Sequence, residues 1–512
     1  MLMTFHPILQ KGVAMSKSNP ADLGALEARQ LIGRKSLSPV ELAEACIKRV
    51  EMLNPAVNAL VAYNFDRVLD EARLAEEKVS RNEALGPLHG LPFGVKDMID
   101  VAGLPTTFGS EIYRDNIAIK DDAIVAVMRG AGAIPFGKTN NPEWSAGGNT
   151  RNAVYGATAN PHDTTKSSAG SSGGSAVLLA SRMAPLATGS DTGGSLRNPA
   201  AFCGVVGFRP SPGVVPGDTR AMALMPLPTS GPMGRDVADV ALMLSVLARP
   251  DRLDPYTVVI DGKTAWQTDR FGAGRRPDLA SLRIAVTEDF GFAPTERVIR
   301  DSFRRVTKRL SSHFGVVEET HPDCADADRI FSVLRGVMFL GTHHKLMLSH
   351  PDKVGTLVRA NVEEGLGYGP LDIADALVKQ GRFYHDWQTF FEIHDYVLCP
   401  AVTISPRDWH ELYPEEIDGK PTKSYYHWLA MAYASTLAGH PSITIPVGRD
   451  TLGMPFGLQI VGRRHDDAGV LQVAAEIEEI LAGDAEFGVP KVDLTALEKA
   501  PALAKQPGFM GF

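Results

Sequence analysis

Residues 170–175 read Gly-Ser-Ser-Gly-Gly-Ser, and residues 189–197 read Gly-Ser-Asp-Thr-Gly-Gly-Ser-Leu-Arg. The two polar segments flank an apolar run, 176–179, that is typical of a packed helix. Glycine permits backbone angles and close approaches that side chains forbid. Two such loops, brought together by one helix, direct many backbone N–H groups and several hydroxyls at one point. The stretch therefore predicts a site for an anion or for a developing oxyanion.

Outward from this stretch, strands and helices alternate. Short apolar runs predict strands at 59–63, 93–95, 133–138, 282–286, 396–398, 442–446 and 457–461. Apolar stripes with helical spacing predict helices at 38–54, 66–79, 122–129, 236–247 and 466–481. Such alternation favours an α/β sheet core. The pair Asn54-Pro55 is expected to end its helix, and residues from 501 onward are interpreted as a loose tail.

Lys96 stands at the end of the apolar run 93–95, in a segment punctuated by proline and glycine. A lysine at the end of an apolar strand is unusual. The pattern alone leaves two interpretations open. The lysine either extends its charge to solvent along its own apolar stem, or it is buried and serves the chemistry of a site.

Composition excludes several classes of protein. The 512 residues carry a net charge of −8, with no long run of like charge, which argues against a nucleic-acid surface or a basic membrane-binding face. No apolar stretch is long enough to span a bilayer. The four cysteines, Cys46, Cys203, Cys324 and Cys399, lie far apart and are interpreted as buried thiols of a cytoplasmic protein. Residues 1–18 are interpreted as a disordered or extension segment, with Met15 as a second candidate start.

Two short motifs suggest other chemistry. Residues 132–139 fit the phosphate-binding pattern Gly-x-x-x-x-Gly-Lys-Thr, but Asn140-Asn141-Pro142 would break the helix that must follow. Residues 170–174 fit Gly-x-Ser-x-Gly with Ser172 as nucleophile, for which Asp395 and His440 would be the partners. Neither pattern is specific, and nothing singles out those partners.

A resemblance accounts for more residues than either motif. Residues 169–175 and 191–197 resemble the two signature segments of the amidase signature family, with Ala169 where that family usually has glycine. The resemblance extends, in the family's order, to four further segments: Gly-Val-Lys-Asp at 94–97, Gly-Lys-Thr-Asn at 137–140, Gly-Pro-Met-Gly-Arg at 231–235 and Gly-Leu-Gln-Ile-Val-Gly at 457–462. It implies one α/β domain over 19–512, with a large central mixed β-sheet flanked by helices on both sides.

The resemblance also implies roles for single residues. The family's nucleophile falls on Ser195, its bridging serine on Ser171 and its lysine on Lys96, and the Gly170–Ser171 peptide is expected to be cis. The oxyanion hole is assigned to backbone N–H groups of the nucleophile's turn, Thr192, Gly193, Gly194 and Ser195 itself. Trp144, Ser145 and Ser172 are candidate substrate-binding residues. Asp191 and Arg197 are expected to organise the site, and His440 to be structural.

The chemistry is coherent. A serine hydroxyl needs a base, no histidine lies in either loop, and a lysine accepts a proton only as the neutral amine, which burial favours. We therefore expect an amidohydrolase that cleaves a carboxamide-type C–N bond through an acyl-enzyme on Ser195, with Ser171 and Lys96 as proton relay and base. It would use no cofactor and no metal.

Two alternatives use the same site. One is hydrolysis of esters or carbamates, including urethanes. The other is the A-type component of the glutamyl-tRNA amidotransferase, although Asn-Asn-Pro-Glu at 140–143 resembles the stand-alone amidases. We expect a small-molecule amide substrate, no nucleic-acid or membrane partner, and a chain compatible with a homodimer.

The substrate pocket is expected to come from the variable region 291–430 and the loop 140–160. The apolar side chains there favour an aryl or alkyl group on the substrate. They are Met338, Phe339, Phe383, Tyr384, Trp387 and Trp428.

Overall fold

A computed structural model describes residues 19–511, except 262, 265, 267–270 and 272–275. The segment 1–18 lies outside the described residues. Among the described residues, no helix combines the length and the apolar character that a membrane crossing requires. The four cysteines are buried and free, as expected.

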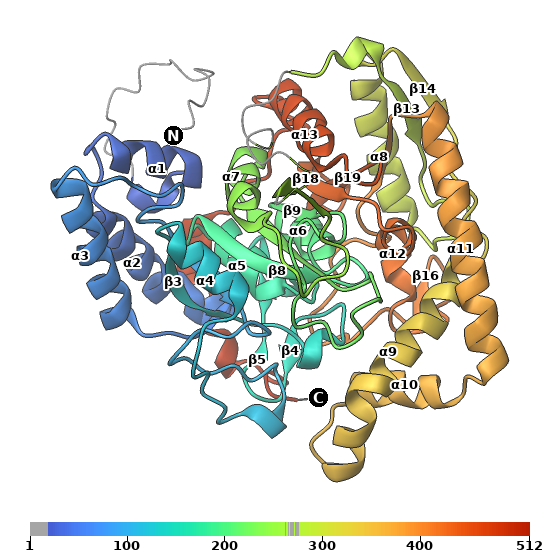
Figure 1. Cartoon of the computed structure of the whole chain (residues 1–512), viewed down its shortest axis with the longest axis horizontal. Coiled ribbons are helices and arrows are strands. Elements are labelled where there is room, and N and C mark those ends of the chain that lie inside the picture. The colour runs from blue at the N-terminus through green and yellow to red at the C-terminus, as the bar shows by residue number, and fades with distance from the viewer. Residues whose placement is uncertain (1–18, 262, 265, 267–270, 272–275, 512) are drawn as a thin grey trace.

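An 11-stranded mixed sheet runs through the molecule (Figure 1). Its strands, in spatial order, are β1 (Leu60–Ala62), β3 (Ile134–Thr139), β2 (Pro92–Lys96), β8 (Leu186–Asp191), β10 (Thr229–Gly234), β9 (Val206–Arg209), β18 (Ser442–Arg449), β19 (Pro455–Gly462), β15 (Tyr396–Pro400), β13 (Arg283–Val286) and β14 (Val316–Glu319). The β3–β2–β8 and β15–β13–β14 neighbours are parallel, and the other pairs are antiparallel. The predicted mixed α/β sheet is confirmed.

Helices accompany the sheet along the whole chain. They are α1 (Ala25–Gly33), α2 (Pro39–Val57), α3 (Phe65–Ser80), α4 (Ala123–Gly130), α5 (Gly173–Ala180), α6 (Arg197–Cys203), α7 (Val237–Leu247), α8 (Arg297–Leu310), α9 (Ala327–Ser349), α10 (Thr356–Leu366), α11 (Pro370–Ile393), α12 (Ala430–Leu437), α13 (Asp467–Leu481) and α14 (Leu494–Lys499). In the described part of the chain, four two-stranded ribbons lie outside the main sheet: β4 (Arg151–Asn152) with β5 (Gly156–Ala157), β6 (Ala159–Asn160) with β7 (Asp163–Ser167), β11 (Val259–Ile260) with β12 (Lys263–Thr264), and β16 (Glu416–Ile417) with β17 (Lys420–Pro421).

The helices cover both faces of the sheet. A Cβ placed on Gly457 of β19 would meet Ala201 of α6, whereas a Cβ placed on Gly462 would meet Val470 of α13. These two positions are an odd number of residues apart, so they face opposite sides of the strand. Helices α6 and α13 therefore lie on opposite faces, as the resemblance implied. Beyond the sheet, α9 packs against α10 and α11, and the three helices form the right-hand edge of Figure 1.

Two local predictions were wrong. The pair Asn54-Pro55 does not end α2, which continues to Val57 and ends at Asn58 in the left-handed conformation. Proline is tolerated there because it lies in the last turn, where its missing N–H leaves only one helical hydrogen bond unmade. Just beyond the helix end, the Asn54 side chain accepts the N–H groups of Ala59 and Leu60.

The chain end is not a loose tail. Leu503 is buried and packs in a small cluster with Trp409, against which Phe509 is also placed. A short apolar segment at a chain end becomes ordered when a groove elsewhere in the fold buries it, and the sequence pattern of the tail alone does not reveal that groove.

Candidate active site

The sheet brings the two signature loops to the lysine. Strands β2 and β8 are parallel neighbours, so their carboxyl ends reach the same edge of the sheet. Lys96 is the last residue of β2, and Asp191 is the last residue of β8. The backbone N–H of Lys96 donates to the Thr188 hydroxyl of β8 at 3.0 Å, which fixes the lysine beside the loop that follows β8.

Lys96 is buried among hydroxyls, so it does not extend its charge to solvent. Its side chain is 0% exposed, and Nζ lies within hydrogen-bonding distance of three Oγ atoms, those of Ser171 at 2.7 Å, Ser190 at 2.9 Å and Ser172 at 3.0 Å. Among the described residues it forms no ion pair. Burial lowers the pKa of Lys96 to about 7, although the charge of Asp191 acts in the opposite direction. Near neutral pH, a large fraction of this side chain is therefore the uncharged amine.

Ser171 and Ser172 immediately precede α5. The Gly170–Ser171 peptide is cis, as expected, and both serine side chains are buried. The N–H of Ser172 donates to the Ser195 carbonyl at 3.3 Å, which joins the two signature loops. Gly174 is required at its position because a Cβ there would lie 2.3 Å from the backbone nitrogen of Asn140.

Ser195 lies in the turn between β8 and α6, where it is half-buried at the pocket wall. The Asp191 carboxylate shapes this turn by accepting the N–H groups of Gly194 at 2.8 Å and Leu196 at 3.1 Å. Gly194 has φ +107°, a region that favours glycine. Because its N–H is already donated to Asp191, Gly194 is not a free oxyanion donor, contrary to our expectation. Within the described chain, the N–H groups of Thr192, Gly193 and Ser195 have no acceptor.

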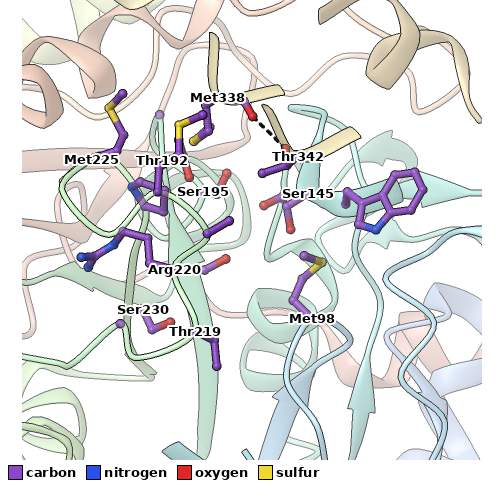
Figure 2. A pocket seen from close by; sticks show the side chains of 18 of the residues that line it. Met98, Ser145, Thr192, Ser195, Thr219, Arg220, Met225, Ser230, Met338 and Thr342 are labelled. Atoms are coloured by element: carbon purple, nitrogen blue, oxygen red, sulfur yellow. Dashed lines mark hydrogen bonds between the residues drawn. The ribbon is translucent and has the colours of Figure 1, made fainter. Parts of the chain in front are cut away.

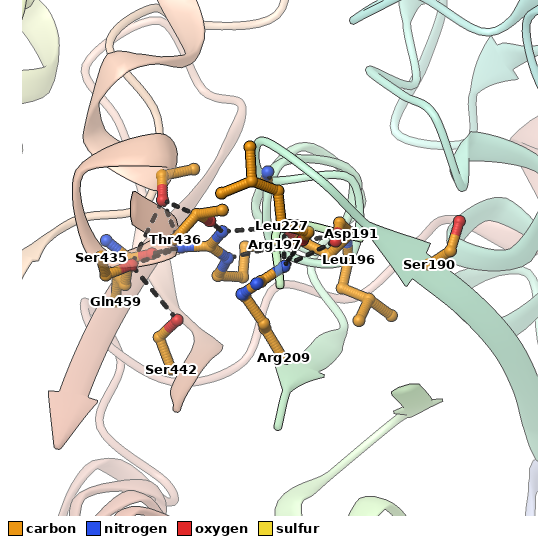
Figure 3. A network of polar contacts seen from close by, with 12 residues as sticks. Ser190, Asp191, Leu196, Arg197, Arg209, Leu227, Ser435, Thr436, Ser442 and Gln459 are labelled. Atoms are coloured by element: carbon orange, nitrogen blue, oxygen red, sulfur yellow. Dashed lines mark hydrogen bonds and ion pairs between the residues drawn. The ribbon is translucent and has the colours of Figure 1, made fainter. Parts of the chain in front are cut away.

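Two arginines hold Asp191 in place (Figure 3). The guanidinium of Arg197 contacts both carboxylate oxygens, through Nε at 3.0 Å and Nη2 at 2.9 Å, and Arg209 donates to the Asp191 carbonyl at 2.6 Å. Burial alone would raise the pKa of Asp191, but the two cations outweigh it and hold the pKa well below its usual range. The expected organising role of Asp191 and Arg197 therefore has a geometric basis, and Arg209 adds to it.

A cavity of about 300 Å³ opens onto the serines (Figure 2). Ser171, Ser190, Thr192, Gly193 and Ser195 line one part of it. The other walls come from α9, from the segment 216–230 and from the residues around Met98. Its lining combines the hydroxyls around Ser195 with methionines and aromatic rings, and it also includes several charged side chains. Such a mixture suits a small organic substrate.

Trp144 and Ser145 lie in this wall, in a turn where both have positive φ values, +43° and +59°. The Ser145 hydroxyl is buried and has no hydrogen-bond partner among the described residues. The Trp144 ring packs against His343 of α9, with ring centroids 4.7 Å apart. Both residues therefore lie where a substrate would contact them.

Several expected pocket residues lie elsewhere. Met338 and Phe339 line the cavity, but Phe383, Tyr384, Trp387 and Trp428 do not. Trp387 is fully buried among Phe290, Phe383 and Phe391, so it belongs to the core. Aromatic content alone does not separate a pocket from a core, because both are apolar.

Other site residues were missed. Ser190 contacts Lys96 because alternate residues of β8 face one side, a signal present in the sequence once β8 is aligned beside β2. The segment 216–230 has no periodic pattern, and its sequence does not predict that it lines a pocket.

The two competing motifs do not form sites. His440 is buried, its Nδ1 lies 2.8 Å from the Gly462 carbonyl, and burial lowers its pKa to about 3. Neither His440 nor Asp395 hydrogen-bonds to Ser172 in the described part of the chain. Lys138 of the phosphate-binding pattern ends in a buried contact with the Ile99 carbonyl at 2.7 Å, and in the described chain β3 is followed by a short 3-10 helix, Glu143–Ser145, and not by the α-helix that the pattern requires. His440 is structural, as expected.

Comparison with known proteins agrees with this geometry. The profile of the Amidase family matches residues 41–471. An acylamidase of Rhodococcus erythropolis is 33% identical over 471 residues, which cover 91% of this chain and 97% of that protein. The A component of the glutamyl-tRNA(Gln) amidotransferase of Symbiobacterium thermophilum is 31% identical over 484 residues, which cover 90% of this chain and 96% of that protein.

Solved structures give the same result. A bacterial aryl acylamidase described as an amidase signature enzyme superposes with a TM-score of 0.83 at 25% identity, over 95% of this chain and 99% of that one. The peptide amidase of Stenotrophomonas maltophilia superposes with a TM-score of 0.75 at 25% identity, over 92% of this chain and 99% of that one. This chain therefore belongs to the amidase signature family and is a hydrolase that acts on carbon–nitrogen bonds.

Proposed function

We propose that the protein hydrolyses the C–N bond of small carboxamides through an acyl-enzyme on Ser195, with Ser171 and Lys96 as the proton relay and base. One observation carries the proposal. Lys96 is a fully buried lysine that has three hydroxyl neighbours and no carboxylate ion pair in the described chain. A neutral amine has one lone pair and two N–H groups, so it satisfies these contacts by accepting from Ser171 and donating to Ser172 and Ser190.

The reaction begins when the Ser195 oxygen attacks the substrate carbonyl carbon. The Ser195 proton passes to Ser171, and the Ser171 proton passes to the Lys96 amine, which becomes an ammonium. The carbonyl oxygen becomes an oxyanion held by the N–H groups of Thr192, Gly193 and Ser195. Each such donor is worth about 3–4 kcal/mol in known hydrolases.

The intermediate then collapses. The C–N bond breaks, and the proton returns along the same path to the leaving nitrogen, which departs as an amine. Water attacks the acyl-enzyme through the same relay, the ester bond to Ser195 breaks, and the carboxylic acid leaves. Ser172 stays a hydrogen-bonding residue in this scheme, and Trp144 and Ser145 contact the substrate.

The domain arrangement supports the same proposal. We treat 19–512 as one functional domain, in which 291–430 supplies the variable wall of the pocket. That region provides α9 and the pocket residues Tyr425 and Leu429.

Hydrolysis of a panel of aryl amides, alkyl amides, carbamates and esters by purified protein tests the proposal. We expect kcat/KM for a good amide to rise with pH through about 7 and to level off above it, because the relay needs neutral Lys96. Ser195→Ala and Lys96→Ala lose activity, by about 10⁴-fold or more. His440→Ala is the matched control. An inactive His440→Ala together with a normally active Lys96→Ala would overturn the mechanism.

A second function is favoured by one finding, since a relative of comparable identity is the A component of an amidotransferase. In that case the chain would act with partner proteins. Size-exclusion chromatography together with the hydrolysis panel separates the two. Full amide hydrolysis by the chain alone supports the stand-alone amidase, and activity that depends on added partner proteins supports the amidotransferase component. Esters and carbamates are substrates if the panel shows turnover that also requires Ser195.

A further inference from the structure

Arg335 is a buried cation in the wall of the substrate pocket. It belongs to α9, its side chain is held in the interior at 6% exposure, and it lines the cavity. Its Nε donates to the Asn361 side-chain oxygen at 2.9 Å, and its Nη2 donates to the Tyr425 hydroxyl. Both partners are neutral, so they orient the guanidinium without balancing its charge.

Aromatic rings surround this guanidinium. Its carbon lies 4.6 Å from the centroid of the Phe339 ring, and the rings of Phe331, Tyr425 and Tyr426 lie between 5.5 and 5.8 Å away. Contacts of this kind offset part of the cost of removing an arginine from water. They also fix the plane of the side chain, which makes Arg335 a preorganised group.

What Arg335 lacks is a carboxylate. It takes part in no ion pair among the residues that the structure describes. Glu364 of the neighbouring α10 accepts hydrogen bonds from the hydroxyls of Tyr426 and Tyr368 instead. The Nη1 group of Arg335 makes no hydrogen bond within the described chain. A buried cation without an anion is costly, and a bound anion removes that cost.

Two other charged groups of the pocket have partners within the described chain. Arg220 pairs with Asp254 at 3.3 Å. Asp122 caps α4 through the N–H of Ile124, and Asp218 lies on the segment 216–230 with Thr219. In Figure 2, Thr219 and Met98 lie at one end of the pocket, whereas Met338 and Thr342 of α9 lie at the other. Arg335 is therefore a positive group on the α9 side of the pocket and, unlike Arg220, it has no carboxylate partner among the described residues.

We propose that Arg335 determines substrate class, by binding a carboxylate carried by the substrate away from the scissile amide. The inference rests on the proposed amide hydrolysis. Arginine suits this task because its planar N–H groups match the geometry of a carboxylate. The preferred substrates are then amides with a free carboxylate on the acyl or the amine part. Arg335 makes no covalent contact and moves no proton in the reaction.

Matched substrates test this inference. In one pair, the p-nitroanilide of a succinyl group, which ends in a carboxylate, is compared with the p-nitroanilide of a 4-oxopentanoyl group, which ends in a neutral methyl ketone of similar shape. In the other pair, N-acetyl-4-aminobenzoate is compared with N-acetyl-4-aminoacetophenone. The ratio of kcat/KM values within a pair is measured for the wild type, Arg335→Lys, Arg335→Met and the uncharged control Met338→Leu.

We expect the wild type to prefer the carboxylate in at least one pair, and Arg335→Met to reduce that preference by about ten-fold or more. Arg335→Lys keeps part of the preference, and Met338→Leu leaves the ratio unchanged. A merely structural Arg335 would lower both members of a pair equally, and an unchanged ratio in Arg335→Met overturns the inference.

Binding to the Ser195→Ala variant separates this inference from the proposed function. Calorimetric titration with the same compounds should show tighter binding of the carboxylate member, and Arg335→Met in the Ser195→Ala background should remove the difference. If the wild type hydrolyses no amide at all, the proposed function fails while the binding comparison still decides the role of Arg335. If both pairs are hydrolysed and bound without regard to charge, the proposed function stands and the inference fails.

Discussion

Lys96 is an ionisable side chain that folding buries completely. Its Nζ is surrounded by Ser171, Ser172 and Ser190, and burial lowers its pKa from 10.5 to about 7. The same burial that prepares a base for catalysis therefore opposes folding whenever the lysine is protonated. The proton on Lys96 therefore affects both the proposed base and the free energy of unfolding.

This linkage predicts a pH-dependent stability. Between pH 7 and pH 9, the unfolded chain keeps the proton on Lys96 while the folded chain has released it, so the free energy of unfolding rises with pH. Relative to Lys96→Met, the wild type should gain about 2 kcal/mol across this window. Urea unfolding of both proteins at pH 6, 7, 8 and 9 measures the difference. Parallel curves for the two proteins over the whole range would contradict a lowered pKa for Lys96.

At the scale of elements, the turn between β8 and α6 is the part whose backbone we propose to bind the oxyanion. The Asp191 carboxylate fixes it through the N–H groups of Gly194 and Leu196. The N–H groups of Thr192, Gly193 and Ser195 are thereby left for the substrate. The geometry of this turn, more than any one side chain, sets the proposed oxyanion site.

Gly194→Ala tests the turn. The alanine Cβ would lie 2.5 Å from the Cβ of Ala432, at a residue with φ +107°. We expect a loss of stability of about 1–3 kcal/mol and a fall in kcat of about 100-fold, because the donors shift relative to the substrate. Gly453→Ala is the matched control, since Gly453 also has a positive φ, +85°, but nothing lies within 4 Å of its Cβ. Equal losses in the two variants would show that only backbone strain matters.

Some of these elements could be predicted from the sequence, and others could not. The two signature loops stood out by their glycine and serine content, but the roles of Lys96, Ser171 and Ser195 came from the resemblance to the amidase signature family, because the pattern alone left Lys96 open. Ser190 and Arg209 became visible only with strand order, since their partners lie in other strands or loops. The loop 216–230 and the core position of Trp387 depend on packing between distant segments, which no local pattern records. The end of α2 was misplaced because a proline in the last turn of a helix removes only one hydrogen bond and does not have to end it.

At the scale of the whole molecule, Arg197 ties separate segments to the active site. Its guanidinium joins Asp191 to the Ala432 carbonyl at 2.8 Å and Thr436 at 2.8 Å on α12, and to Gln459 at 2.7 Å on β19 (Figure 3). Three parts of the chain that are far apart in sequence meet at this one side chain. Removing it leaves the buried Asp191 with Arg209 as its remaining cation.

Arg197→Met should therefore destabilise the fold strongly, by about 3–5 kcal/mol, and lower activity by loosening the turn before α6. Arg304→Met is the control, because Arg304 forms an exposed ion pair with Glu288, and its loss should cost at most about 1 kcal/mol. Chemical unfolding followed by fluorescence compares the three proteins. A cost for Arg197→Met as small as that of the control would mean that the network around Asp191 is not what holds these segments together.

The identity of the nucleophile is the central claim, and trapping the acyl-enzyme tests it most directly. The protein is mixed with an activated p-nitrophenyl ester, quenched in acid, digested and analysed by mass spectrometry. We predict one acyl group on the peptide that contains Ser195, and no such adduct in Ser195→Ala, whereas Ser172→Ala still forms it. An acyl group on Ser172 or Ser171, or an unchanged adduct in Ser195→Ala, would contradict the account.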